Sequence, residues 1–210
     1  VYVYSTATLV RHAGVMRDAL RDLDDPLIAY AVKANPNPAV LATLARTGFN
    51  PDHLMLEITE GMVIQNLALV EQVMQRLRQR GIKFALDDFG CGYSDLSTLR
   101  KLPICVLKID RSLLVDAEAE QSARIILRSV VSLCRELGIL SICEGAETAA
   151  QVAFLRTIGC NMVQGFATGR PGPLDAVQKM LRGPRAAAPA TSPSARPETR
   201  AMDLSRLTAS

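Results

Sequence analysis

The sequence has little of what builds zinc sites, disulfide frameworks or membrane spans. Its 210 residues include no Trp, two His and five Cys, and no two Cys form a Cys-x-x-C pair. An odd number of isolated Cys indicates reduced thiols rather than a disulfide framework or a structural zinc site. No apolar run approaches the roughly 20 residues that a membrane span requires, and no charged-then-apolar leader opens the chain. We therefore expect a cytoplasmic protein without a membrane segment.

What the sequence does have is apolar content. Hydrophobic residues make up 49% of the chain, which is enough for one sizeable α/β core. The formal net charge of +3 is mild, and much of it comes from Arg near the C-terminus, so it does not favour a nucleic-acid duplex as partner. After about Gly183 the composition shifts to Ala, Pro, Ser and Arg, which predicts a disordered tail over Pro184–Ser210.

Strand and helix patterns alternate along the chain with short connections, which is typical of parallel βαβ units. The strands are expected at residues 27–32, 54–58, 83–86, 106–109, 140–143 and 161–163. The helices are expected at about 5–23, 39–46, 63–77, 94–102, 119–137 and 149–158. The predicted fold class is therefore α/β, an incomplete TIM-type (β/α) barrel of about six parallel strands. Because a closed barrel of this class has eight strands, we expect an open or strained barrel with unpaired edges that is marginally stable or self-associates.

Two adjacent acids stand out in the stretch Leu86–Ser94, which reads Leu-Asp-Asp-Phe-Gly-Cys-Gly-Tyr-Ser. Asp87 and Asp88 follow directly after the expected buried strand at residues 83–86. Two carboxylates at a strand end are costly to bury unless a cation neutralises them. Taken alone, the pair is explained equally well by a turn in which an Asp caps the next helix.

Further polar side chains follow the other expected strands. In a parallel barrel the carboxyl ends of the strands converge on one mouth. The polar residues at these ends are Glu57, Asp87 with Asp88, Lys108, Glu144 and Gln164. Carboxylate and amide oxygens suit Mg²⁺ or Mn²⁺, and both His lie elsewhere in the sequence, which disfavours zinc. Any one acid is explained by a cap or a surface ion pair, but polar groups at five successive strand ends favour a two-metal phosphodiester site.

Several of these stretches resemble motifs of the EAL-domain cyclic-di-GMP phosphodiesterases, in that family's order, over about residues 50–182. The resemblance rests on Leu56-Glu57-Ile58-Thr59-Glu60, Leu86–Ser94, Leu107–Ser112, Glu144–Thr148 and Gln164-Gly165-Phe166. It implies a barrel that linearises cyclic di-GMP with two Mg²⁺ or Mn²⁺ ions.

The resemblance also implies a role for each matching residue. Glu57, Asp87 and Asp88 would bind metal, Lys108 would orient the attacking water or the phosphate, and Glu144 would act as general base. The supporting residues that it implies are Glu60, which would brace the loop after Asp88, Glu147, which would support the floor of the site, and Gln164, which would line it.

The chain departs from the family pattern upstream of residue 50. It contains no Glu-Ala-Leu tripeptide and no Val-Asn-Leu-Ser-like motif, each of which supplies a further metal ligand in the family. We therefore expect the phosphodiesterase activity to be impaired. The alternative is a degenerate, non-catalytic module that binds cyclic di-GMP or a protein partner.

Residues 1–48 resemble a different family. The stretch Tyr30-Ala31-Val32-Lys33-Ala34-Asn35 is similar to the start of diaminopimelate decarboxylase, a barrel enzyme that uses pyridoxal phosphate. This resemblance implies that Lys33 forms the Schiff base with the cofactor, although an exposed Lys at the start of a Pro-rich loop explains the residue as well. We expect a chimera of three segments, at 1–48, 49–183 and 184–210. The remaining alternatives are a pyridoxal-phosphate decarboxylase fragment and a fusion product without a selected function.

Overall fold

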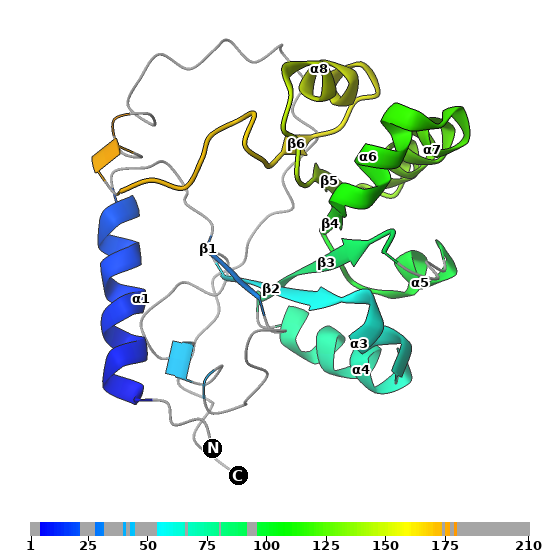
Figure 1. Ribbon diagram of the computed structural model, residues 1–210. Helices are drawn as coiled ribbons and strands as arrows, with labels where there is room; N and C mark the ends of the chain where they lie inside the picture. Colours follow the sequence, from blue (N-terminus) through cyan, green and yellow to red (C-terminus); the bar gives the residue numbers. More distant parts are fainter. Residues whose placement is uncertain are drawn as a thin grey trace. The chain divides into compact units, whose positions relative to one another are not determined.

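A computed structural model gives the arrangement of the chain (Figure 1). The structure describes residues 5–21, 28–31, 40, 43–44, 54–65, 67–79, 81–91, 96–173, 175–176 and 179. The chain divides into two units, Val1–Arg170 and Pro171–Ser210, and all helices and strands named below belong to the first. The predicted tail over residues 184–210 lies outside the described residues.

The first unit is built on one parallel sheet of six strands, ordered from β1 to β6 as in the sequence. The strands are β1 Ile28–Ala31, β2 Leu54–Thr59, β3 Lys83–Phe89, β4 Val106–Ile109, β5 Leu140–Cys143 and β6 Met162–Val163. The predicted α/β class with six parallel strands is confirmed. Within the part of the chain that the structure describes, β1 and β6 are the two ends of the sheet and are not paired with each other, so the sheet is open.

From β2 onward, helices connect the strands as the alternating pattern predicts. The described helices are α1 Thr6–Leu20, α3 Glu60–Gln65, α4 Leu67–Arg78, α5 Leu96–Lys101, α6 Arg111–Ala119, α7 Gln121–Glu136 and α8 Ala149–Thr157. The predicted cap of the first helix is confirmed, because the Ser5 hydroxyl accepts a hydrogen bond of 3.3 Å from the backbone N–H of Thr8. α8 begins with a capping box in which Thr148 and Gln151 each bond the other's backbone N–H.

The helix predicted at about 119–137 is confirmed as α7, but the pattern did not predict α6, which precedes it and is separated from it by an extended Glu120. The start of α6 is explained by Asp110, whose carboxylate accepts a 2.8 Å hydrogen bond from the Ser112 backbone N–H. This cap starts a helix directly after β4.

The two faces of the sheet differ in what they bury. Toward the helices, one large apolar cluster includes Leu56, Ile58, Phe84, Leu86, Leu107 and Ile109. A second, smaller cluster consists of Met55, Ala85 and Val106, with Ile142 packed against it. Because side chains alternate along a strand, the residues two positions further on continue the face of the smaller cluster. Those residues are Glu57, Asp87, Lys108 and Glu144, so the polar site follows directly on a small apolar layer.

Candidate metal centre

Lys108 lies at the centre of the polar site and forms ion pairs with three acids. Its Nζ is 3.2 Å from Glu57 Oε2, 2.8 Å from Asp87 Oδ1 and 2.8 Å from Glu144 Oε1. These side chains come from β2, β3, β4 and the residue after β5. The side chain of Lys108 is 11% exposed and that of Asp87 only 1%. The predicted convergence of acids from separate strands is therefore observed.

The acids keep Lys108 charged. Burial alone would lower the pKa of its ammonium group, but hydrogen bonds to Asp87 and Glu144, and the charges of those carboxylates, outweigh burial and raise the pKa. A buried ion pair persists when its geometry is good and its remaining hydrogen bonds are satisfied. Lys108 meets the first condition, because its three donor hydrogens face three carboxylates.

The strand ends differ from the prediction in a way that matters for the acids. β3 was expected to stop at Leu86, and it runs to Phe89, with a shift in its register against β4 between Leu86 and Phe89. Asp88 has a φ of 58°, in the left-handed region that Asp tolerates better than most residues. Successive residues of a regular strand point to opposite faces, and such an irregularity re-aims one of them.

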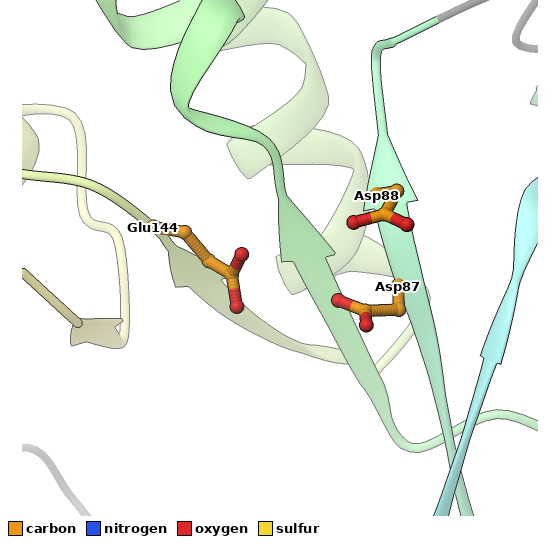
Figure 2. A group of neighbouring side chains, drawn as sticks. All are labelled: Asp87, Asp88 and Glu144. Atoms are coloured by element: carbon orange, nitrogen blue, oxygen red, sulfur yellow. The ribbon is translucent and has the colours of Figure 1, made fainter. Parts of the chain in front are cut away.

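This irregularity lets two neighbouring acids act together. One carboxylate oxygen from each of Asp87, Asp88 and Glu144 lies within 4.8 Å of the others. Figure 2 shows the carboxylates of Asp87 and Glu144 directed into the same space, with Asp88 next to Asp87 on the same strand. Oxygens on opposite sides of a Mg²⁺ or Ca²⁺ ion are about 4–5 Å apart. The three side chains are thus spaced to bind one hard divalent cation.

The predicted metal ligands and this group overlap without being identical. Asp87 and Asp88 belong to both, whereas Glu144 takes the place of Glu57 among the residues that the structure describes. Glu57 lies beside the group, because it accepts a hydrogen bond from Lys108. The assignment of Glu57 as a ligand and of Glu144 as a base stays a prediction.

The remaining predicted residues are distributed around the centre. The Gln164 backbone N–H donates to Cys143 O at 2.9 Å, and its carbonyl accepts from Ala146 N at 3.2 Å, which places Gln164 beside the segment that carries Glu144. Glu60 is the first residue of α3 and is 8% exposed. Glu147 pairs with Arg111 at 3.0 Å, outside the Lys108 ion pairs. Lys33 lies outside the described residues, although Ala31, two positions earlier, is in register with Glu57.

Two thiols near the centre have raised pKa values. Burial, with lesser contributions from Cys160 and Glu144, raises the pKa of Cys143 to about 12. Burial and a hydrogen bond with Asp110 raise the pKa of Cys91 to about 11. Because a metal ion binds the thiolate form strongly, the raised pKa values favour carboxylate oxygens over these two thiols as ligands.

Sequence reasoning missed two features of the site. The first is the regular spacing by which an apolar residue precedes each site residue by two positions, as in Met55 and Glu57 or Val106 and Lys108. That signal is present in the sequence and would have placed the acids on one face. The second is Arg111 with its contacts to Gly145 and Glu147, for which the sequence offers no periodic signal.

Comparison with known proteins places the chain in a family. The sequence profile of the EAL domain matches residues 17–171. The chain belongs to the EAL domain family. This EAL domain is 39% identical over 142 residues to the cyclic di-GMP phosphodiesterase NbdA of Pseudomonas aeruginosa, covering 68% of the chain and 18% of that relative. It is 40% identical over 174 residues to an uncharacterized signaling protein of Caulobacter vibrioides, covering 78% of the chain and 21% of that relative.

Solved structures of EAL proteins share the fold. The PaMucR phosphodiesterase in complex with c-di-GMP matches with a TM-score of 0.72 and 32% identity, over 82% of this chain and 72% of that one. Klebsiella pneumoniae BlrP1 in complex with manganese and cy-diGMP matches with a TM-score of 0.64 and 29% identity, over 77% and 43%. The chain spans about a fifth of the length of the two curated relatives. None of the described helices is both long and apolar enough to cross a membrane.

Proposed function

We propose that this EAL domain is a metal-dependent phosphodiesterase that hydrolyses cyclic di-GMP to a linear dinucleotide. The observation that carries the proposal is Lys108, held within 3.2 Å of Glu57, Asp87 and Glu144, with Asp88 beside them. A relative is named a cyclic di-GMP phosphodiesterase, and a matching structure holds c-di-GMP. Because the substrate and the acids of the site are both negatively charged, divalent cations between them would offset the repulsion.

The donor set fits Mg²⁺ or Mn²⁺. Asp87, Asp88 and Glu144 each supply a hard carboxylate oxygen, and these oxygens lie within 4.8 Å of one another. Glu57 lies close by and pairs with the same Lys108. Lys108 pairs with three carboxylates and Asp88 lies beside two of them, so the four acids leave negative charge for a divalent cation to balance. A bound divalent cation polarises the phosphate and lowers the pKa of water. The structure of BlrP1 with manganese and cy-diGMP supports this choice of metal class.

The protein's own residues then divide the remaining work. Glu144 would accept the proton of the attacking water through the carboxylate oxygen that does not hold the metal, and the water oxygen bonds to phosphorus. Where a bound cation draws one of the three acids away from Lys108, the N–H released there would donate a hydrogen bond to that water or to a phosphate oxygen. The bond from phosphorus to the ribose oxygen breaks, and that oxygen leaves as an alcohol after taking a proton from solvent, while the proton held by Glu144 returns to solvent. Gln164 lines the site, Glu60 braces the loop after Asp88, and Glu147 supports the floor.

Hydrolysis of cyclic di-GMP by the purified chain, followed by chromatography with and without Mn²⁺, tests the proposal. We expect metal-dependent product formation that falls at least about 100-fold in Glu144→Gln, because a general base typically contributes that much. Glu136→Gln, on the exposed end of α7, is the matched control and should keep the wild-type rate. Turnover slower than that of complete EAL enzymes would agree with the predicted impairment. Binding of cyclic di-GMP without any turnover would contradict the proposal and support the non-catalytic module.

The resemblance of residues 1–48 to diaminopimelate decarboxylase, and with it the chimera, stays a prediction. The match to the EAL domain begins at residue 17, inside that segment. If Lys33 binds pyridoxal phosphate, the protein mixed with the cofactor will show the visible absorbance of an internal aldimine, and Lys33→Ala will abolish it. No such absorbance would remove the pyridoxal-phosphate alternative.

A further inference from the structure

Arg111 connects the strand end that carries Lys108 with the segment that carries Glu144. It is the first residue of α6, three positions after Lys108. Its Nη1 lies 3.0 Å from Glu147 Oε1, three positions after Glu144. The two side chains are 56% and 42% exposed, so the charge pair by itself contributes little to stability. If the pair has a role, that role is to hold neighbouring residues in position rather than to stabilise the fold.

The aliphatic part of Arg111 lies directly on Gly145. A Cβ at position 145 would come 2.6 Å from Arg111 Cβ and 2.7 Å from its Cδ, closer than such atoms approach in proteins. Gly145 also has a φ of 69°, which any other residue adopts at a cost. Arg111 can thus cover the residue next to Glu144 only because that residue is Gly.

The same segment also lies against Gly165, in the chain after β6. A Cβ at position 165 would collide with the backbone of Ala146. Ala146 donates a 3.2 Å hydrogen bond to Gln164 O and accepts a 2.9 Å hydrogen bond from Ala167 N. Gly145 therefore lies against Arg111, and Ala146 lies against the chain after β6.

Glu144, next to these contacts, is also bonded directly to β4. The Glu144 backbone N–H donates to Ile109 O at 2.9 Å, and its carboxylate is 2.8 Å from Lys108 Nζ. We propose that Arg111 is a positioning residue, which clasps residues 144–147 and so holds the Glu144 carboxylate against Lys108 and the paired Asp residues. The inference rests on the proposed function, and it adds a residue that does not touch the reacting atoms. Displacement of a catalytic group by about 1 Å lowers a rate by up to about 100-fold.

A positioning role and a substrate-binding role predict different kinetics. If Arg111 positions Glu144, Arg111→Ala lowers kcat for cyclic di-GMP about tenfold and changes KM less than about twofold, because substrate contacts stay. If Arg111 instead binds the substrate phosphate, KM rises and kcat stays. The matched control is Arg128→Ala, an exposed Arg on α7, which should leave both constants unchanged.

The clasp also predicts a rescue and a signal that does not depend on turnover. The double variant Arg111→Glu/Glu147→Arg restores the ion pair with reversed charges, so its kcat should exceed that of either single variant. Mn²⁺ affinity, measured by electron paramagnetic resonance of the free ion, should fall about threefold in Arg111→Ala, since Glu144 is one of the clustered oxygens. The thermal midpoint of the metal-free protein should move by no more than about 2 °C, as for an exposed pair.

The outcomes separate the clasp from the proposed function. A wild-type kcat in Arg111→Ala, a change confined to KM, or a double variant no better than the singles would overturn the clasp. A wild-type chain without hydrolysis would overturn the proposed function alone. In that event the Mn²⁺ measurement still decides whether Arg111 holds the acids together.

Discussion

At the scale of single residues, the main feature of the site is the ammonium group of Lys108, whose positive charge partly neutralises the surrounding carboxylates. Lys108 pairs with three carboxylates, and Asp87 among them is almost completely buried. Removing one partner of a buried ion pair leaves uncompensated charge, which costs about 3–5 kcal/mol. Lys108 therefore stabilises the metal-free protein as well as serving the proposed chemistry, and a divalent cation bound to the same acids competes with it for them.

Replacing Lys108 separates these two contributions. In Lys108→Met we expect the metal-free protein to lose about 3–5 kcal/mol of unfolding free energy, because the acids lose their cation. Mn²⁺ should then raise the thermal midpoint more in the variant than in the wild type, since a ligand that binds only the folded state stabilises it. Calorimetry with and without Mn²⁺ measures both effects. Lys101→Met, at the exposed end of α5, is the control, and equal Mn²⁺ shifts in wild type and Lys108→Met would refute the competition.

At the scale of the elements, two deviations from the predicted pattern shape the site. β3 continues through its acids to Phe89 with a register shift, and α6 begins directly after β4. The first deviation depends on Asp88 at φ 58°, which a pattern of apolar and polar residues does not reveal. The second depends on the Asp110 cap, which was visible in the sequence as an Asp before a helix-forming run. α6 in turn places Arg111 over Gly145.

The cap of α6 has a predictable pH dependence. Burial would raise the pKa of Asp110, but hydrogen bonds from Ser112 outweigh it and lower the pKa below 3.8. A carboxyl with a lowered folded-state pKa stabilises the fold above its unfolded pKa, and this contribution is lost as the pH falls through the folded value.

Asp110→Ala tests this assignment. We expect the variant to be about 1 kcal/mol less stable than the wild type near neutral pH, as for the loss of an N-cap. The difference should shrink as the pH falls below about 4, because the wild type then loses the charged form. Urea unfolding across this pH range measures the difference. Asp116→Ala, an exposed position in the same helix, should show no comparable loss, and a pH-independent deficit in Asp110→Ala would contradict the explanation.

At the scale of the whole molecule, the sheet is the feature that sets behaviour in solution. In the described part of the chain the six strands end at β1 and β6, which do not pair with each other. A strand edge without a partner presents backbone groups that pair with another chain. β6 is short, and its Met162 is 41% exposed. A charged side chain at position 162 should therefore be compatible with the fold.

Self-association is the expected consequence. We expect the mass measured by light scattering to rise with protein concentration, and Met162→Lys to lower it, because a Lys on an edge strand opposes pairing with another chain. Val73→Lys, a similarly exposed apolar position on α4, is the control for added charge. A stable monomer at every concentration would disprove self-association through the edges.

The sequence by itself determined the class of fold and the identity of the clustered acids. Alternating apolar patterns mark strands and helices because burial follows the local period of each element, and Glu57, Asp87, Lys108 and Glu144 stand out because each ends or follows such a pattern. Tertiary structure decided the rest. Asp88 turns beside Asp87 only in the shifted register of β3, and Arg111 finds Gly145 only once β4 and β5 lie side by side. Those contacts join residues far apart in the chain, so their geometry depends on the packed sheet and has no counterpart in local residue order.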